Sequence, residues 1–317
     1  MKKILTHILF IISIVVLVPT IILKGYSGDC VIKSRYCKKI DVYYKKDDKI
    51  VYLPLEEYIK CVVAKEMPAL FEIETLKAQA IAVRTFVYKK MSEEKSKVHK
   101  GATVCTDFAH CQAYAEKDAI LVGWEDDAEK NWDKISKAVD ETTGKVVCYD
   151  NELILPLFHS NSTGLTESSK EIWSSIDIPY LRSVESFGTE DVSYVRLSVD
   201  EFKKKILHKY PNIKFSSDVF SDIKEIERNE SDRVRHVKIS ENIIKGEVFR
   251  EIFSLKSTNF KLVNIGNNKI EIKVYGSGHG VGLCQVGANE MAKRGKKFDD
   301  ILKHYYGNIN IVNFFDK

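Results

Sequence analysis

The amino-acid sequence predicts an α+β fold, in which helices and short antiparallel strands are mixed. Apolar residues recur at helical spacing, three or four residues apart, between Ile73 and Val87. Short apolar runs separated by turn residues recur between residues 223 and 275 and indicate strands. The helices and strands do not alternate regularly, as they would around a parallel sheet. No internal repeat and no linker rich in proline, glycine or serine divides the sequence, so we expect one folded unit.

The sequence begins with an apolar segment long enough to cross a lipid bilayer. Residues 4–23 contain few polar residues and are flanked by lysines on both sides. A helix of this length matches the ~30 Å hydrocarbon core of a membrane. A cleaved signal peptide usually has a shorter apolar region and a small-residue cleavage site, which residues 24–30 do not provide. We therefore expect a cytoplasmic tail and a single transmembrane anchor over residues 1–24, and an extracytoplasmic domain over residues 25–317.

The rest of the chain has the composition of a folded and nearly neutral protein. Hydrophobic residues make up 44% of the chain and aromatic residues 10%. The chain has 49 basic and 45 acidic residues, and three of the basic ones flank the apolar segment. A charge balance near zero, without a basic patch, gives no electrostatic basis for binding the phosphate backbone of a nucleic acid. We therefore expect no nucleic-acid partner.

Two strands and two helices are predicted after the apolar segment. Residues 40–44 and 50–53 are apolar runs on either side of a charged turn, which is typical of a β-hairpin. Pro54 opens a helix with two glutamates in its first turn, and this helix ends near Glu66 because a proline follows. The second helix carries the apolar stripe described above.

Another face of the second helix carries Lys77, Arg84 and Tyr88, seven and then four residues apart. Residues at this spacing share one side of a helix. The line is either a solvated face or a row of functional side chains, and spacing alone leaves both interpretations open.

Further strands and helices are predicted in the second half of the chain. Residues 145–149 and 153–158 form a predicted hairpin, and Ser198 with Glu201 forms a capping box, the pattern that opens a helix. Another helix runs from Cys284 to a closing glycine. The remaining predicted elements are strands at residues 223–226, 234–239, 256–263 and 269–275, and a helix near residues 248–253.

Four potential metal ligands lie close together in the sequence: His99, Cys105, His110 and Cys111. Two thiolates and two imidazoles are a common tetrahedral ligand set for zinc, and a closed set of four protein ligands is normally structural. The adjacent positions 110 and 111 require a turn. A Cys105–Cys111 disulfide and unrelated surface residues are the alternatives. On ligand chemistry alone, we expect a structural zinc ion.

Two segments combine small and polar residues in the manner of binding loops. Residues 276–283 contain four glycines around His279, and glycine allows positive φ and the close approach of a ligand. Their spacing differs from that of a dinucleotide-binding fingerprint. Residues 158–164 place hydroxyl and amide side chains, including that of Ser162, after a predicted strand, which suits the hydroxyl groups of a sugar. Structural loops are the alternative for both, and the second lacks the G-x-S-x-G pattern of a serine hydrolase.

Glu66 is an acidic residue in a largely apolar run that stops at a proline. A carboxyl group buried among apolar side chains resists ionisation because its charged form loses hydration. Such a group can donate a proton near neutral pH, as a general acid does. The alternative is a glutamate on the solvated side of an amphipathic helix. The apolar setting alone does not decide between the two.

Three segments together resemble the stage II sporulation protein D family of spore-forming bacteria. They are L-E-E-Y through E-M-P at residues 55–68, L-K-A-Q-A through R-T at residues 76–85, and G-H-G-V-G through Q-V-G-A at residues 278–288. The sequences S-T-G at residues 162–164 and H-Y-Y at residues 304–306 add to the match. The resemblance covers nearly the whole chain.

The resemblance implies a membrane-anchored lytic transglycosylase that cuts peptidoglycan glycan strands at the sporulation septum during engulfment of the forespore. The catalytic acid of the family's E-M-P motif falls on Glu66. Its acid form would protonate the oxygen between N-acetylmuramic acid and N-acetylglucosamine. Its carboxylate would then take the proton of the muramic 6-hydroxyl, which closes a 1,6-anhydro ring. The resemblance also implies a glycan cleft lined by Lys77, Gln79, Arg84, Ser162 and His279. Relatives often have another small or sulfur-bearing residue where Cys284 stands.

Partners and alternatives also follow from the resemblance. The implied partners are an amidase that removes stem peptides and a membrane-protein scaffold. Related amidase-enhancer proteins suggest an alternative function, a non-catalytic glycan-binding enhancer of a peptidoglycan amidase. Glycosidases usually use two carboxyl groups about 5–10 Å apart, and Asp107, Glu167 or Glu171 could supply the second. A zinc hydrolase is disfavoured because four protein ligands leave no open position for water.

Overall fold

The computed structural model describes residues 39–173 and 176–315 of the chain. The expected membrane anchor, residues 1–24, lies outside the described residues. Among the residues that are described, none of the helices combines the length and the apolar composition of a membrane span. They contain helices and several small sheets of short, mostly antiparallel strands, which confirms the α+β fold.

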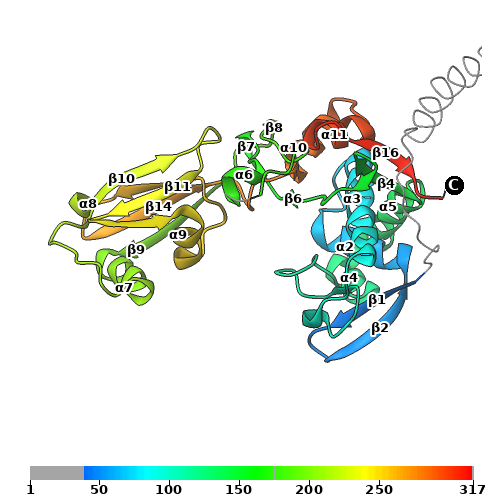
Figure 1. Ribbon diagram of the computed structural model, residues 1–317, viewed down its shortest axis with the longest axis horizontal. Coiled ribbons are helices and arrows are strands. Elements are labelled where there is room, and N and C mark those ends of the chain that lie inside the picture. Colours follow the sequence, from blue (N-terminus) through cyan, green and yellow to red (C-terminus); the bar gives the residue numbers. More distant parts are fainter. Residues whose placement is uncertain (1–38, 174–175, 316–317) are drawn as a thin grey trace, which may run out of the picture.

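The described residues form two lobes joined by a narrower middle region (Figure 1). The second lobe consists of residues 192–275, and the first lobe is built from the segments before and after it. Each lobe has a hydrophobic core of its own. The middle region contains strands β7 (Thr163–Leu165) and β8 (Glu185–Phe187) and the short helix α6 (Ser169–Ile172).

A three-stranded sheet opens the first lobe and contains the predicted hairpin. Strand β1 (Lys39–Tyr44) pairs antiparallel with β2 (Lys49–Pro54). The short strand β3 (Val104–Cys105) pairs parallel with β1. Asp48, in the turn between β1 and β2, adopts a left-handed conformation with φ 53° that aspartate tolerates better than most residues. Strand β3 leads directly into the group of potential metal ligands.

Helices α2 (Leu55–Glu66) and α3 (Ile73–Ser92) form the centre of the first lobe, close to the predicted bounds. α2 begins directly after β2, with its two glutamates near the positive end of the helix dipole. It ends because Met67 is extended, as the residue before a proline usually is. This ending places Glu66 at the last position of the helix.

α3 is buried on most of its sides because several elements surround it. α2, helix α5 (Ala128–Asp140) and strand β4 (Lys145–Tyr149) all pack against it. Small alanines on its faces let these neighbours approach closely. Arg84 and Tyr88 are buried, so the interpretation of their line as a solvated face is wrong.

The predicted hairpin after residue 145 is only partly present. β4 pairs antiparallel with β5 (Glu152–Leu153), as expected. The second predicted strand, however, does not continue, because it contains Pro156, which has no N–H group for a ladder of hydrogen bonds. The end of this segment, β6 (Phe158–His159), pairs in parallel with β15 (Leu283–Cys284). This pairing brings the two predicted binding loops together.

Two helices near the end of the chain complete the first lobe. α10 (Gln285–Lys293) is the predicted helix, and Gly295 follows it with φ 84°. α11 (Phe298–Tyr305) is absent from the sequence prediction, and so are α4 (Lys117–Trp124) and α5. The final strand β16 (Asn310–Asn313) pairs with β4.

The second lobe packs its helices against two antiparallel sheets of three strands, in the orders β13-β14-β9 and β10-β11-β12 (Figure 1). Its core includes stacked aromatic rings, among them Phe249 and Phe260. The predicted capping box is present between Ser198 and Glu201. The elements are β9 (Val192–Ser198), α7 (Val199–Lys209), α8 (Val219–Asp222), β10 (Ile223–Arg228), β11 (Val234–Ile239), β12 (Asn242–Lys245), α9 (Gly246–Phe253), β13 (Phe260–Asn264) and β14 (Lys269–Tyr275).

Candidate active site and metal centre

Glu66 is half-buried at the C-terminal end of α2. Its carboxylate oxygen Oε1 accepts a hydrogen bond of 2.5 Å from the backbone N–H of Ala113. Burial raises the pKa of the Glu66 carboxyl above its usual value, and the hydrogen bond from Ala113 opposes this by favouring the carboxylate. The interpretation of Glu66 as a partly buried acid with a raised pKa is therefore the one that the structure supports.

The glycine-rich segment approaches Glu66 through Gln285, the first residue of α10. The side-chain amide of Gln285 donates a hydrogen bond of 2.9 Å to the backbone carbonyl of Glu66. Next to it, the Cys284 thiol accepts a hydrogen bond from the backbone N–H of Ser162. The backbone N–H of Val286 donates to the carbonyl of Ser160. These contacts join three separate parts of the chain: the end of α2, the serine-containing loop and the start of α10.

Ser162 and His279 lie in two loops that contact each other. The buried hydroxyl of Ser162 is 2.7 Å from Nε2 of His159 and accepts a hydrogen bond of 2.9 Å from Arg233. The rings of His159 and His279 are 5.8 Å apart. Burial, aided by the positive charge of Arg233, lowers the pKa of His279 to about 4. His279 is therefore a neutral imidazole near neutral pH.

Glycine is required at two positions beside these side chains. Gly278 has φ 99°, and a Cβ atom there would lie 2.7 Å from the Cβ of His159. Gly280 has φ 89°, and a Cβ atom there would lie 2.6 Å from the guanidinium carbon of Arg233. Both φ values also disfavour residues with a side chain. The glycines thus let the loop of His279 approach its neighbours closely.

The other residues expected to line a glycan cleft are held within the first lobe. Arg84 is fully buried and forms two hydrogen bonds with Glu56, of 3.0 and 2.6 Å. Lys77 is held between two carboxylates, those of Glu74 and Glu141. Gln79 is fully buried, and its amide atoms have no partner among the described residues. In the described part of the chain, none of these three side chains hydrogen-bonds to Glu66, Ser162 or His279.

Each carboxyl group that could assist Glu66 has partners of its own. Asp107 forms an ion pair with Lys45 at 2.6 Å. Glu171 binds the guanidinium of Arg235 through both of its oxygens. Glu167 is buried, and its Oε2 accepts hydrogen bonds from Asn229 and Ser231.

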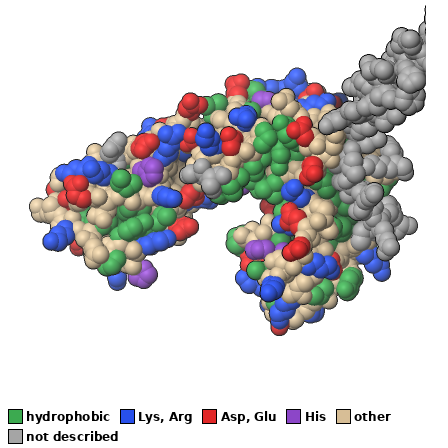
Figure 2. Space-filling view, viewed as in Figure 1, with side chains coloured by type: hydrophobic (Ala, Val, Ile, Leu, Met, Phe, Trp, Pro, Cys, Tyr) green, Lys and Arg blue, Asp and Glu red, His purple; other side chains and the backbone are tan. Residues whose placement is uncertain are grey.

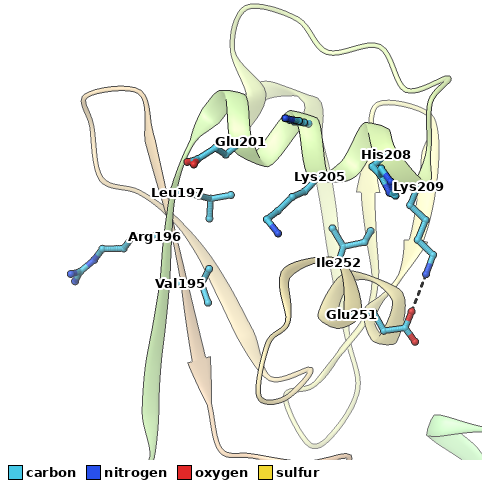
Figure 3. A pocket seen from close by; sticks show the side chains of 10 residues that line it. Val195, Arg196, Leu197, Glu201, Lys205, His208, Lys209, Glu251 and Ile252 are labelled. Atoms are coloured by element: carbon cyan, nitrogen blue, oxygen red, sulfur yellow. Dashed lines mark hydrogen bonds and ion pairs between the residues drawn. The ribbon is translucent and has the colours of Figure 1, made fainter.

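Four pockets of the described residues, with volumes from about 420 to about 710 Å³, are not lined by Glu66. One of about 710 Å³ lies on the second lobe between β9, α7 and α9 (Figure 3). Its floor is apolar, with Val195, Leu197 and Ile252, and its rim carries the ion pair of Lys209 and Glu251. None of these four pockets is the expected glycan cleft around Glu66. Figure 2 instead shows an open hollow between the two lobes on this face of the molecule.

The four potential metal ligands come together next to β3. His99 belongs to a short 3-10 turn (Lys97–His99), Cys105 ends β3, and His110 and Cys111 follow in a turn. The carbonyl of Asp107 accepts the N–H groups of both residues 110 and 111, which provides the turn that adjacent ligands require. One ligand atom from each of the four side chains lies within 4.8 Å of the others.

The donor set fits a tetrahedral zinc ion. Sγ of Cys111 lies 3.4 Å from Nε2 of His99 and 3.7 Å from Nδ1 of His110, and Sγ of Cys105 lies 3.9 Å from the same His110 atom. Bonds of about 2.0–2.3 Å to one tetrahedral ion give ligand separations of this size. Nε2 of His99 and Nδ1 of His110 are closer, at 2.6 Å, so the two imidazoles would move apart on binding the ion. Both cysteines are free thiols, so the alternative of a Cys105–Cys111 disulfide is wrong for this structure. Burial lowers the pKa of His99, which favours the neutral imidazole that a metal binds.

Four residues of this region were not predicted: Ala113, His159, Arg233 and Gln285. Gln285 is the first residue of the Q-V-G-A motif that the chain shares with the family, and this motif is the sequence feature that could have identified it. Ala113 contacts Glu66 through a backbone N–H, which no side-chain pattern encodes. Arg233 belongs to the second lobe, and its contact with Ser162 spans 71 residues of sequence.

Comparisons with known proteins show which family the chain resembles. A family model described as "Stage II sporulation protein" matches residues 43–149, which include α2, α3 and the four potential metal ligands. Stage II sporulation protein D of Bacillus amyloliquefaciens is 37% identical over 278 residues, covering 86% of this chain and 78% of that protein. The protein of the same name from Bacillus subtilis is 36% identical over 272 residues, covering 84% and 77%. The amidase enhancer of B. subtilis is 26% identical over 307 residues, covering 81% of this chain and 40% of that protein.

Proposed function

Since this chain belongs to the stage II sporulation protein D family, we propose that it is a lytic transglycosylase acting on peptidoglycan. It cuts the bond between N-acetylmuramic acid and N-acetylglucosamine in the glycan strands, with Glu66 as acid and then base. Its biological setting is sporulation, and the proposed task is the degradation of septal peptidoglycan during engulfment of the forespore.

The observation that carries this proposal is the environment of Glu66. Burial raises the pKa of its carboxyl, which keeps a proton available for donation. The N–H of Ala113, bound to Oε1, stabilises the carboxylate once the proton has left. A group that donates a proton and later accepts one needs both influences.

The chemistry balances with this one carboxyl group. Glu66 protonates the glycosidic oxygen, the bond from that oxygen to C1 of the muramic acid breaks, and the N-acetylglucosamine leaves with a free hydroxyl. The muramic 6-hydroxyl oxygen then bonds to C1, and its proton passes to the Glu66 carboxylate. No water is consumed, so a second carboxyl group to activate water is unnecessary. The three other candidate carboxyl groups, those of Asp107, Glu167 and Glu171, are already bound to other residues, which agrees with a mechanism that does not need them.

The loops of Ser162 and His279 are proposed to bind the glycan near Glu66. They are joined to the end of α2 through Cys284 and Gln285. A neutral imidazole suits hydrogen bonding with sugar hydroxyls because it both donates and accepts. Lys77, Gln79 and Arg84 were expected to share this role. Because Arg84 and Gln79 are fully buried, we infer that neither contacts the glycan, and that Arg84 acts by fixing α3 against α2 through Glu56.

A structural zinc ion is proposed at His99, Cys105, His110 and Cys111. Bound there, the ion would hold the turn that precedes Ala113, with all four positions taken by protein atoms. It would therefore stabilise the structure without taking part in the cleavage.

The proposed location and partners follow from the family and from the apolar segment of the sequence. Residues 1–24 would anchor the protein in the cell membrane with the two lobes outside the cytoplasm. An amidase that removes stem peptides would supply bare glycan strands, and membrane proteins would hold the two enzymes together.

The test is the mass of the products from peptide-free glycan strands. The full-length wild type is expected to release fragments with anhydro ends, one water lighter than hydrolysis products. Glu66→Gln, which keeps the size and polarity of the side chain but cannot transfer the proton, is expected to release none. Fragments that have gained water would indicate hydrolysis, and equal cleavage by the variant would exclude the role of Glu66.

A second candidate function is favoured by the similarity to an amidase enhancer. In that case the protein would bind glycan and stimulate a peptidoglycan amidase without cutting the strand. Adding the wild type or Glu66→Gln to an amidase reaction separates the two. Stimulation by both proteins, with no anhydro products from either, would support the enhancer.

A further inference from the structure

Arg233 is a buried cation that belongs to the second lobe but contacts the candidate site. It stands immediately before β11, and only 3% of its surface is exposed. One guanidinium nitrogen, Nη2, donates a hydrogen bond of 2.9 Å to the Ser162 hydroxyl. The other, Nη1, donates to the carbonyl of Gly278 at 3.2 Å and to the hydroxyl of Thr258 at 3.3 Å. One side chain thus joins the Ser162 loop, the His279 loop and the second lobe.

This arrangement is not an ordinary buried ion pair. Among the described residues, no carboxylate lies within ion-pair distance of Arg233. Burying a charge without a paired carboxylate is costly unless its hydrogen bonds are satisfied. Here the acceptors are a hydroxyl and a carbonyl of the two loops, together with a hydroxyl of the second lobe. The free-energy cost of burial is therefore offset by these hydrogen bonds and by the negative charges of Glu167 and Glu247 nearby, and the hydrogen bonds fix the two loops against each other.

The turn that carries Arg233 is itself fixed against the middle region. Asn229 accepts the backbone N–H of Arg233 at 3.0 Å through its side-chain oxygen and donates to Glu167 at 2.6 Å through its side-chain nitrogen. Ser231 also donates to Glu167. The backbone N–H of Glu167 donates to the carbonyl of Gly280. The same turn therefore reaches the His279 loop by a second, independent route.

We propose that Arg233 is a positioning residue of the glycan-binding site, and that the second lobe completes this site by holding the Ser162 and His279 loops together. This inference rests on the proposed binding of glycan by these loops. Arg233 itself is too buried to touch the strand. Its fork of donors bridges three acceptors at once, which a lysine ammonium cannot reproduce in the same geometry.

If Arg233 has this role, replacing it should weaken glycan binding more than it slows the cleavage step. Glu66 is held by Ala113 and Gln285. Among the described residues, neither of these two hydrogen-bonds to Arg233. A misplaced loop should therefore raise KM more than it lowers kcat, since the Ser162 loop reaches Glu66 only indirectly, through the start of α10. Partial unfolding would do the reverse, because it lowers the amount of active enzyme and hence kcat.

The first measurement is the binding of peptide-free glycan strands to full-length protein carrying Glu66→Gln, so that no strand is cut. Adding Arg233→Lys or Arg233→Met is expected to weaken binding by about ten- to a hundredfold, the range that small misplacements of a site produce. Arg235→Met is the matched control. Arg235 lies two residues further along at the same lobe junction, but its ion pair with Glu171 is exposed and touches neither loop. Its variant should bind within about twofold of the unsubstituted protein.

The second measurement is KM and kcat of the same Arg233 variants with Glu66 intact, taken below the unfolding temperature of each variant. Arg233→Lys keeps the buried charge and carries the test if Arg233→Met does not fold. Unchanged binding in Arg233→Lys, or a loss confined to kcat, would overturn the positioning role alone. If the protein with intact Arg233 bound no glycan, the proposed function would fail and this role with it.

Discussion

The side-chain amide of Gln285 donates a hydrogen bond of 2.9 Å to the backbone carbonyl of Glu66, a residue 219 positions earlier in the chain. The last carbonyls of a helix have no partners within the helix. Because Glu66 is the last residue of α2, Gln285 satisfies one of these carbonyls and fixes the backbone that carries the carboxyl group. The N-terminal end of α10 thereby sets the position of the proposed catalytic residue.

Gln285→Ala should therefore lower activity more than it lowers stability. We expect a loss of about 1 kcal/mol in the free energy of unfolding for the missing hydrogen bond, and a fall of about tenfold or more in kcat because Glu66 is displaced. Denaturant unfolding and the release of anhydro fragments measure the two effects. Asn289→Ala is the matched control, since this amide on the same helix accepts a hydrogen bond from the backbone of Glu72 instead. Similar losses of activity in both variants would contradict the prediction.

The raised pKa of Glu66 predicts a specific dependence of stability on pH. A carboxyl group with a raised pKa in the folded state binds more protons there than in the unfolded chain. Its contribution to stability therefore falls as pH rises from the unfolded value, near 4.5, through the folded one. Glu66→Gln removes this pH-dependent loss of stability. The unfolding temperature of the variant should therefore exceed that of the wild type increasingly above pH 4.5. A constant difference between the two proteins across this range would show that the pKa of Glu66 is ordinary.

The lowered pKa of His279 predicts the opposite pH dependence, a loss of stability as pH falls. Its pKa is lowered to about 4 in the folded state from 6.5 in an exposed histidine, so the unfolded chain takes up a proton that the folded chain refuses. Stability is retained above pH 6.5 and is lost as pH falls towards 4, by on the order of 2–3 kcal/mol. His279→Gln should be less sensitive over this window in thermal unfolding. His208→Gln, on the second lobe, is the control and should keep the wild-type pH dependence.

The fold could be predicted where a segment carries its own signal. The bounds of α2 follow from a proline at each end, and the capping box at Ser198 marks the start of α7. α4 is short and has one buried residue, Ile120, so it carries little signal of its own. α5 was missed although Trp132, Ile135 and Val139 recur in it at helical spacing. The burial of α3 on several faces also could not be predicted. It depends on neighbours that arrive from distant parts of the sequence.

The candidate site was predictable as a set of residue types, but its contacts were not. Glu66 and the four potential metal ligands stand in recognisable local patterns, and the structure brings those ligands together. The bonds that fix Glu66 come from a backbone N–H and from a side chain in another segment. Arg84 was expected beside the glycan because the family resemblance implied it. Its burial against Glu56 depends on how α2 packs on α3.

Arg84 should therefore behave as a structural residue. It is fully buried and binds Glu56 through two hydrogen bonds, so Arg84→Met leaves a carboxylate without its partner. We expect a loss of about 3 kcal/mol in the free energy of unfolding, at the lower end for broken buried pairs because Glu56 is partly exposed. The double variant Glu56→Gln/Arg84→Met should lose less than the sum of the two single variants. A fully stable Arg84→Met protein with abolished glycan binding would instead support a role at the cleft.

The metal centre is expected to control Glu66 through Ala113, which lies two residues after Cys111 and donates to the Glu66 carboxylate. Metal analysis should find about one zinc ion per chain, held by four protein ligands. Cys111→Ser should lose the zinc, unfold at a lower temperature and cleave glycan more slowly, because the turn before Ala113 is no longer fixed. Cys61→Ala is the control, since this buried free thiol lies outside the ligand cluster, and it should retain the ion. A metal-free wild-type protein with full stability and cleavage would rule out the zinc site. Slow cleavage by a Cys111→Ser variant that still holds zinc would show that Cys111 affects Glu66 independently of the metal.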